Sequence, residues 1–176
     1  AVTSQTASEA WGMRGSDFTF VVNEETGFGT FTLSTSIWNS YICLKECDGY
    51  WGTNPELSST AEAIAHMREN NYNVIVFKVK VTSGTARIYA PTTGNAQSYV
   101  SISNTYVPQA GIEDYIMVYD ANGNALTSGA STPYGTEYTV VIHYNVNNAM
   151  TGGYGEICIK GQACVVEVGG VSFYSA

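Results

Sequence analysis

Apolar and hydroxyl side chains alternate along much of this chain, which is the pattern of half-buried β-strands. The first two such segments, residues 17–22 and 29–34, are separated by turn-forming residues at 24–27 and so predict a β-hairpin. More segments of this kind follow in the second half of the chain. They cover residues 74–81, 85–90, 99–102, 114–119 and 138–144, a hairpin that includes Cys158 and Cys164, and residues 171–174.

Turn and helix signals separate the predicted strands. Ser83 and Gly84 predict a turn between two strands, and the Asn122-Gly123 pair predicts a tight hairpin turn. One helix is predicted at residues 59–70, where a serine and a glutamate have the spacing of a capping box and apolar residues recur every three or four positions. The first sixteen residues are predicted to form an extended lead-in.

Short strands at regular spacing, turn signals between them and a single short helix predict an all-β fold. We expect an antiparallel β-sandwich of the jelly-roll type. At 176 residues the chain is long enough to bury one substantial core, and no shift in composition marks a second domain. Residues 1–176 are therefore predicted to form one domain.

The charge balance limits the partners of the protein. Charged residues make up only 12% of the chain, and the formal net charge is -8. A negative surface gains nothing from meeting nucleic acid or an anionic membrane, so neither is expected as a partner. No run of about twenty apolar residues predicts a membrane span. The polar but weakly charged composition is typical of a secreted or cell-surface protein that binds neutral ligands.

The four cysteines fall in two pairs, which are Cys43 with Cys47 and Cys158 with Cys164. Their spacing differs from that of zinc knuckles, and neither histidine lies near a pair in the sequence, so no metal site is predicted. Secretion favours disulfides. Cys158 and Cys164 are symmetric about Gly161, and a hairpin there would bring them face to face. All three connectivities of four cysteines, and the fully reduced state, stay open.

Residues 35–55 hold two of the three tryptophans and two of the four cysteines, beside charged and amide side chains. Trp38 and Tyr41 lie among apolar residues, which favours a place in the core but leaves ligand contact open. Tyr50 and Trp51 lie between turn-forming residues that predict a surface loop. Their rings are predicted either to stack on a ligand or to pack over the edge of the sandwich.

No motif for catalysis stands out. The sequence lacks both the nucleophile elbow of the α/β-hydrolases and the paired histidines of zinc peptidases. Most carboxylates lie in predicted turns, strand ends or loops, where solvated carboxylates are ordinary, so a glycosidase pair is not the favoured interpretation. Neither enzyme activity nor a cofactor is predicted.

Sugar binding requires less specialised chemistry than catalysis. Aromatic rings stack on the apolar faces of pyranose rings, and charged or amide side chains bind the hydroxyl groups. Both kinds of group occur in residues 35–55. The predicted ligand-binding residues are Trp38, Tyr41, Lys45, Glu46, Asp48, Tyr50, Trp51 and Asn54.

The last third of the chain resembles the closing strands of secreted β-sandwich carbohydrate-binding modules. The similar segments are residues 138–144, 156–159 and 165–174, which end on a Val-Ser-Phe-Tyr strand. Gly169 and Gly170 stand where those modules carry an acidic or amide pair, so one polar position is missing. The low charge and the abundance of Tyr, Gly, Asn and Thr are similar to domains of the polysaccharide-degrading systems of gut anaerobes, which include starch-adherence modules.

The resemblance implies a non-catalytic carbohydrate-binding domain that tethers a larger secreted or cell-surface bacterial protein to a polysaccharide. A glucan is the preferred ligand, with starch or another α-glucan slightly favoured over β-glucan, and the domain itself is expected to be monomeric. Two alternatives stay open. One is a protein-interaction or adhesin domain of the same fold, in which exposed aromatic residues contact a partner chain. The other is a glycoside hydrolase.

Overall fold

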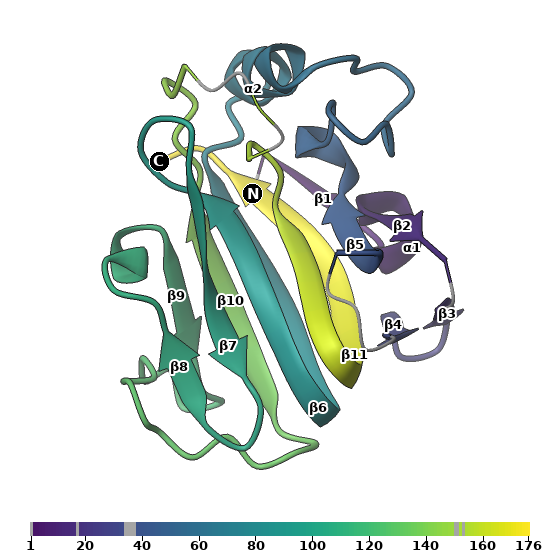
Figure 1. Cartoon of the computed structure of the whole chain (residues 1–176), viewed down its shortest axis with the longest axis vertical. Helices are drawn as coiled ribbons and strands as arrows, with labels where there is room; N and C mark the ends of the chain where they lie inside the picture. Colours follow the sequence, from purple (N-terminus) through teal and green to yellow (C-terminus); the bar gives the residue numbers. More distant parts are fainter. Residues whose placement is uncertain (1, 17, 34–37, 150–151, 153) are drawn as a thin grey trace.

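The computed structural model describes residues 2–16, 18–33, 38–149, 152 and 154–176 (Figure 1). Its strands are β1 (Thr3–Gln5), β2 (Trp11–Gly15), β3 (Thr19–Asn23), β4 (Phe28–Thr32), β5 (Ser40–Leu44), β6 (Val74–Pro91), β7 (Gln97–Ile102), β8 (Tyr106–Pro108), β9 (Ile116–Tyr119), β10 (Glu137–His143) and β11 (Cys158–Tyr174). Its helical segments are α1 (Ala7–Ala10), α2 (Thr60–Glu69) and the 3-10 turns η1 (Lys45–Cys47) and η2 (Ile112–Asp114). The predicted strand ends at residues 17 and 34, and residues 35–37 of the aromatic segment, lie outside the described residues.

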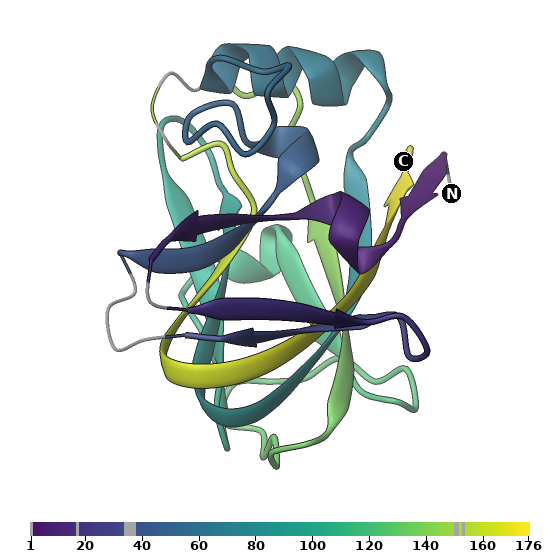
Figure 2. The ribbon, with the colours of Figure 1, turned by 90° about the vertical axis from the view of Figure 1, so that its right-hand side faces the viewer.

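The fold is all-β and antiparallel, as predicted, and is built on two long strands. β6 and β11 pair with each other over most of their length. The first part of β11 also pairs with β5, and its later part pairs with β4. On the other side, the first part of β6 pairs with β10 and its last part with β7. The bend of β11 is visible in Figure 2, and it lets one continuous sheet fold into a sandwich-like arrangement around the core.

Irregularities in β11 explain how one continuous strand contributes to both layers of the sandwich-like fold. Ile157 and Ile159 lie in the core, whereas further along the strand the buried positions are Val166 and Val168. The pairing register with β6 shifts between Gln162 and Val166. An inserted residue bends a strand and moves the following side chains to the opposite face. Cys158 and Lys160 in the first part of β11, and Glu156 just before it, therefore lie away from the main core.

Two predicted turns are wrong because each lies inside a strand that continues through it. Gly84 has a positive φ of 72° but lies inside β6, which continues through residues 83 and 84 instead of turning. Cys158 and Cys164 lie on one continuous strand, so they do not face each other across a hairpin. The cross-strand partner of Cys158 is Cys43. The four cysteines are buried thiols in the structure.

The predicted helix is confirmed. In α2, the Ser59 hydroxyl accepts a hydrogen bond from the backbone N–H of Glu62 at 3.2 Å, and the helix ends at Asn70. Ile64 and Met67 on its inner face belong to the core. The helix crosses one end of the sandwich (Figure 2) and closes the core there.

The first hairpin and the turn after β9 also agree with the sequence. β3 pairs with β4 in register, and the side chain of Asn23 accepts a hydrogen bond from the Glu25 N–H in the turn between them. After β9, the N–H of Asp120 donates to the carbonyl of Asn124 at 2.9 Å, closing the turn at the Asn-Gly pair. Local turn chemistry therefore predicted these two connections correctly.

The N-terminal segment is more structured than the predicted lead-in. It forms β1, the single turn α1 and β2. Trp11, the first residue of β2, is buried, and its indole N–H donates to the carbonyl of Gly169 at 3.1 Å. Its ring packs edge-to-face on Phe77 with the centroids 5.1 Å apart. The segment thus closes the core beside β11. None of the described helices is long and apolar enough to cross a membrane.

Candidate functional site

A row of four side chains crosses four neighbouring strands on the side of the sheet that faces away from the main core. Arg14 of β2 is opposite Tyr41 of β5, which is opposite Lys160 of β11, which in turn is opposite Arg87 of β6. Residues directly opposite each other in antiparallel strands project from the same face. The fold therefore brings three cations and a tyrosine, far apart in the sequence, onto one surface.

The next row forms an apolar floor beside these cations. Cys43, Cys158, Tyr89 and Tyr99 are consecutive partners across β5, β11, β6 and β7. Together with Tyr41 they form a small hydrophobic cluster separate from the main core. The rings of Tyr89 and Tyr99 lie 4.9 Å apart. This cluster gives the outer face of the sheet a packed apolar base beside the three cations.

A hollow of about 310 Å³ opens above this base, and we call it the aromatic pocket. It is lined by Trp38, Tyr50, Trp51, Gln97, Gly152, Tyr154, Glu156 and Lys160. Its four aromatic residues come from the segment before β5, the loop after η1 and the segment before β11. All four are exposed, and Trp38 most of all, with 66% of its surface accessible. Four large rings from three segments thus converge on one small volume.

The loop that carries Tyr50 and Trp51 is fixed by buried Asp48. The Asp48 carboxylate accepts hydrogen bonds from the Trp51 N–H at 3.0 Å and from the Thr53 hydroxyl at 2.5 Å. Gly49 lies so close to the start of α2 that a Cβ there would be 2.2 Å from the carbonyl oxygen of Ser59. The turn residues therefore set the position of Trp51, and the rings of Tyr50 and Trp51 pack edge-to-face with their centroids 4.7 Å apart.

Lys160 is enclosed by aromatic rings. Its ammonium nitrogen lies 5.0 Å from the ring centroid of Trp38, 4.6 Å from that of Tyr41 and 5.0 Å from that of Tyr89. Only 5% of the residue is exposed. Cation–π attraction of this kind strengthens as water is excluded. The ammonium therefore holds the Trp38 ring, on the pocket side, against the sheet.

Two acceptor oxygens in the aromatic pocket lack a partner. Glu156 is 2% exposed, and burial raises its pKa to about 7, against the opposing effect of the Lys160 ammonium and a hydrogen bond from Trp51. Within the described part of the chain, the Oε2 atom of Glu156 and the Oε1 atom of Gln97 are buried and accept no hydrogen bond. Because unpaired buried polar atoms are costly, the pocket is suited to a ligand with hydroxyl groups, which donate to the Gln97 oxygen and either donate to ionised Glu156 or accept from it when it is protonated.

A second hollow of about 300 Å³ adjoins the aromatic pocket, and we call it the arginine hollow. It is lined by Arg14, Gly15, Ser16, Trp38, Asn39, Tyr41 and Trp51. Trp38 and Trp51 line both spaces, so the two hollows are adjacent. The guanidinium carbon of Arg14 lies 5.5 Å from the centroid of the Trp51 ring, and its Nε atom is buried without an acceptor among the described residues.

The four predicted aromatic residues come together as a group. Trp38, Tyr50 and Trp51 line the aromatic pocket, and Tyr41 lines the arginine hollow next to it. The sequence alone did not reveal the residues that complete these spaces. Among them are Arg14, Gln97, Tyr154, Glu156 and Lys160. The alternation of Glu156, Cys158 and Lys160 at the start of β11 was a usable signal, because an extended segment places both charges on the same face.

The four predicted polar partners make other contacts. Lys45 donates to the carbonyl of Ser8 at 3.2 Å, and Glu46 bonds to His66 on α2. Asn54 accepts from the N–H of Glu56 within its own turn. Asp48 accepts the hydrogen bond from the Trp51 N–H described above. None of these four residues lines the aromatic pocket or the arginine hollow.

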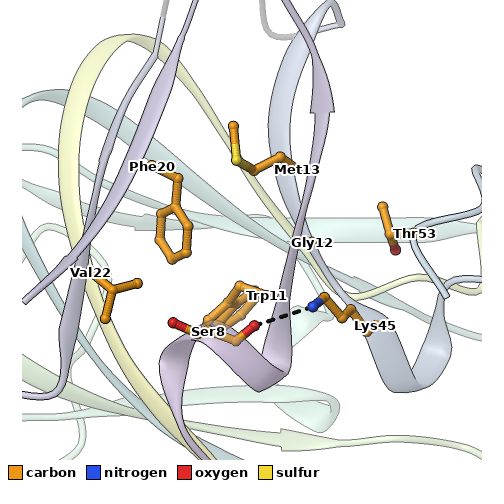
Figure 3. A pocket seen from close by; sticks show the side chains of 8 residues that line it. All are labelled: Ser8, Trp11, Gly12, Met13, Phe20, Val22, Lys45 and Thr53. Carbon is orange, nitrogen blue, oxygen red and sulfur yellow. Dashed lines mark hydrogen bonds between the residues drawn. The ribbon is translucent and has the colours of Figure 1, made fainter. Parts of the chain in front are cut away.

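An apolar groove of about 400 Å³ lies on another part of the surface, between β2 and β3. Figure 3 shows Trp11, Met13, Phe20 and Val22 around it. Its one charged side chain, Lys45, is occupied by the hydrogen bond drawn there to Ser8. Among the described residues, no buried polar atom without a partner belongs to its lining. The groove offers less for specific recognition than the aromatic pocket.

The functional assignment rests on this geometry. No protein-family model matches the sequence, and no curated protein is significantly similar to it. The described residues contain no group of three or more His, Cys, Asp or Glu side chains that could hold a metal ion. The aromatic pocket with the adjoining arginine hollow is therefore the candidate functional site.

Proposed function

We propose that the protein is a non-catalytic carbohydrate-binding domain and that the aromatic pocket holds its ligand. One observation carries this proposal: four exposed aromatic rings line a hollow of about 310 Å³, and two further lining residues, Gln97 and Glu156, each have a buried side-chain oxygen without a partner among the described residues. A sugar offers apolar ring faces for stacking and hydroxyl groups that donate hydrogen bonds. It therefore complements both features at once.

The size of the pocket supports a small ligand unit. Its volume is at the lower end of the range that is usual for small-molecule sites. The adjoining arginine hollow continues the surface past Trp38 and Trp51. A chain of sugar units can therefore extend through both spaces and contact the two indole rings that line them. Such an arrangement suits a domain that tethers a secreted or cell-surface protein to a polysaccharide.

Binding without catalysis is favoured by the carboxyl groups. Most glycosidases need two carboxyl groups about 5–10 Å apart across the scissile bond. Among the described residues that line the two hollows, Glu156 is the one carboxylic acid. Asp48, the nearby buried carboxylate, already accepts two hydrogen bonds within its own loop. We therefore assign Glu156 to hydroxyl recognition.

Affinity electrophoresis in gels that contain soluble starch, mixed-linkage β-glucan, xylan or an acidic polysaccharide tests the proposal. Starch is the first ligand to try, because the sequence resemblance favours an α-glucan. We expect at least one glycan to retard the wild-type protein and the Trp38→Ala variant to migrate as if no glycan were present. Tyr174→Ala, which removes an exposed ring at the far end of β11, is the matched control and should be retarded like the wild type.

Two results contradict this assignment. Retardation that survives Trp38→Ala would place the binding surface elsewhere on the protein. Indifference of the wild type to neutral and acidic glycans alike would reject carbohydrate binding and favour the protein-interaction function, for which exposed aromatic residues form the hot spot.

A further inference from the structure

The basic residues of this acidic protein are concentrated at the candidate site. The chain has seven lysines and arginines against fifteen acidic residues. Three of the seven, Arg14, Lys160 and Arg87, lie in the single row across β2, β5, β11 and β6. Neighbouring strands are about 4.8 Å apart, so the backbone positions of the row span about 14 Å. A protein with net charge -8 thus presents a compact positive strip beside its aromatic rings.

Among the described residues, none of these three cations takes part in an ion pair, although Lys160 shares the aromatic pocket with Glu156, whose buried carboxyl group has a pKa raised to about 7. The described ion pairs join Lys78 to Glu137, Lys80 to Glu167, and Glu46 to a histidine. The cations of the row instead contact aromatic rings. Lys160 contacts the rings of Trp38, Tyr41 and Tyr89, and Arg14 contacts the ring of Trp51. The guanidinium carbon of Arg87 lies 4.6 Å from the ring centroid of Tyr99. Ring contacts stabilise a cation but leave its charge uncompensated.

Burial makes the missing counter-charge significant. Lys160 is 95% removed from solvent, and the Nε atoms of Arg14 and Arg87 are buried without hydrogen-bond acceptors in the described structure. A buried cation without an anion is costly, and the cost is removed when a ligand supplies the negative charge. Arg14 is the member of the row that both lines a hollow and has an unoccupied donor.

We infer that the ligand is an acidic glycan, in which the carboxylate of a uronic acid unit lies against the Arg14 guanidinium in the arginine hollow while a neighbouring neutral unit occupies the aromatic pocket. This inference rests on the proposed carbohydrate binding. The planar guanidinium matches a carboxylate in a bidentate arrangement. The neutral unit belongs in the aromatic pocket because the groups there that lack partners among the described residues are the Gln97 oxygen, an acceptor, and the Glu156 carboxyl group, which exchanges hydrogen bonds with hydroxyl groups and, once ionised, repels a carboxylate.

The test compares acidic polymers with matched neutral ones. Polygalacturonate, alginate and glucuronoxylan are each offered beside a carboxyl-reduced form, in which a CH2OH group replaces every carboxylate. We expect the wild type to bind at least one acidic polymer roughly tenfold or more tightly than its reduced form, the change expected for one charge-assisted contact. Added salt should weaken this preference.

Variants assign the preference to Arg14. Arg14→Gln should remove the difference between the acidic and reduced polymers, and Arg14→Lys should keep part of it, because it keeps the charge without the bidentate geometry. Lys78→Gln, which removes the same charge from an exposed site on β6, is the matched control and should bind like the wild type. Thermal melts of all variants confirm that each one is folded.

The failures of the two proposals are distinguishable. Equal binding of reduced and acidic polymers, or of starch and acidic polymers, overturns the acidic-glycan inference and leaves carbohydrate binding intact. A preference for acidic polymers that persists in folded Arg14→Gln also overturns the inference. Failure to bind any polymer, acidic or neutral, overturns both.

Discussion

The ammonium nitrogen of Lys160 lies 5.0 Å from the ring centroid of Trp38. This contact joins a buried strand in the middle of the sheet to the most exposed tryptophan of the protein. Because Lys160 also contacts the rings of Tyr41 and Tyr89, the position of Trp38 depends on the sheet and not on its loop alone. A ring that is already oriented loses little conformational entropy when a ligand stacks on it.

Lys160 also acts on the carboxyl group in the same pocket. Its positive charge lowers the pKa of Glu156. We predict that Lys160→Met raises the pKa of Glu156 above its wild-type value of about 7, since burial is then less opposed. NMR titration of the glutamate side-chain carbons measures this directly. Lys80→Met, whose ammonium pairs with Glu167, is the control and should leave the Glu156 titration unchanged. An unaltered pKa in Lys160→Met would refute the coupling.

The raised pKa of Glu156 predicts how stability depends on pH. In the folded protein the carboxyl group keeps its proton up to about pH 7, whereas in the unfolded chain it ionises near the ordinary value of 4.5. Between these values the folded state binds more protons, so the free energy of unfolding should fall as pH rises from about 4.5 to about 7 and then level off. The loss is on the order of 3 kcal/mol at most.

Urea unfolding at a series of pH values checks this dependence. Glu156→Gln should remove most of the fall between pH 4.5 and 7, because the amide does not ionise. Glu24→Gln, in the exposed turn between β3 and β4, should keep it. A wild type whose stability does not fall across this interval, or a fall that is just as large in Glu156→Gln, would contradict the raised pKa of Glu156.

The cysteine register predicts which disulfide can form. The Leu44 N–H donates to the Ile157 carbonyl at 2.9 Å, so the adjacent pair, Cys43 and Cys158, is a pair without backbone hydrogen bonds between its members. In such pairs the Cα atoms are about 4.5 Å apart, within the range that a disulfide needs. We expect a non-reduced digest of protein refolded with oxidised glutathione to contain a Cys43–Cys158 link.

The same digest contains its own control. Cys158 and Cys164 lie on one strand, so a peptide that links them should be absent. Cys43→Ser should abolish the disulfide without creating another one at Cys158. A Cys158–Cys164 link in the wild-type digest would mean that this part of β11 is a hairpin after all.

The alternation of side chains predicted the fold class and most strands, but it failed where a strand continues through an irregularity. Gly84 in β6 and the residues around Gly161 in β11 resemble turn signals. In the folded protein these glycines lie where the two long strands are close to each other: a Cβ on Gly84 would be 2.4 Å from the carbonyl oxygen of Ala163. A sequence does not distinguish a glycine required by the close packing of two strands from a glycine required by a turn.

The site was predicted only in part, because strand pairing brings residues from distant parts of the sequence to the pocket. Tyr50 and Trp51 were found because exposed rings in a loop are unusual by themselves. Trp38 was expected in the core with Tyr41; that expectation is wrong for Trp38, which is 66% exposed, whereas Tyr41 is buried. Polar partners were sought close to them in the sequence, at Lys45 and Asn54, whereas the polar groups of the pocket come from β7, β11 and the segment before β11. Only the pairing of strands brings these groups beside the loop, and that pairing depends on the bulges.

The central claim is that the aromatic pocket binds a glycan, and Trp51 tests it most directly because it lines both hollows. Calorimetric titration of Trp51→Ala, with a glycan that binds the wild type and a thermal melt alongside, separates stacking from packing. Trp51→Phe keeps a ring and serves as the matched control. We predict that Trp51→Ala weakens binding by roughly tenfold or more, as loss of an aromatic stacking contact does elsewhere, while Trp51→Phe retains most of it. Unchanged affinity of folded Trp51→Ala, with a lowered melting temperature, would contradict the account.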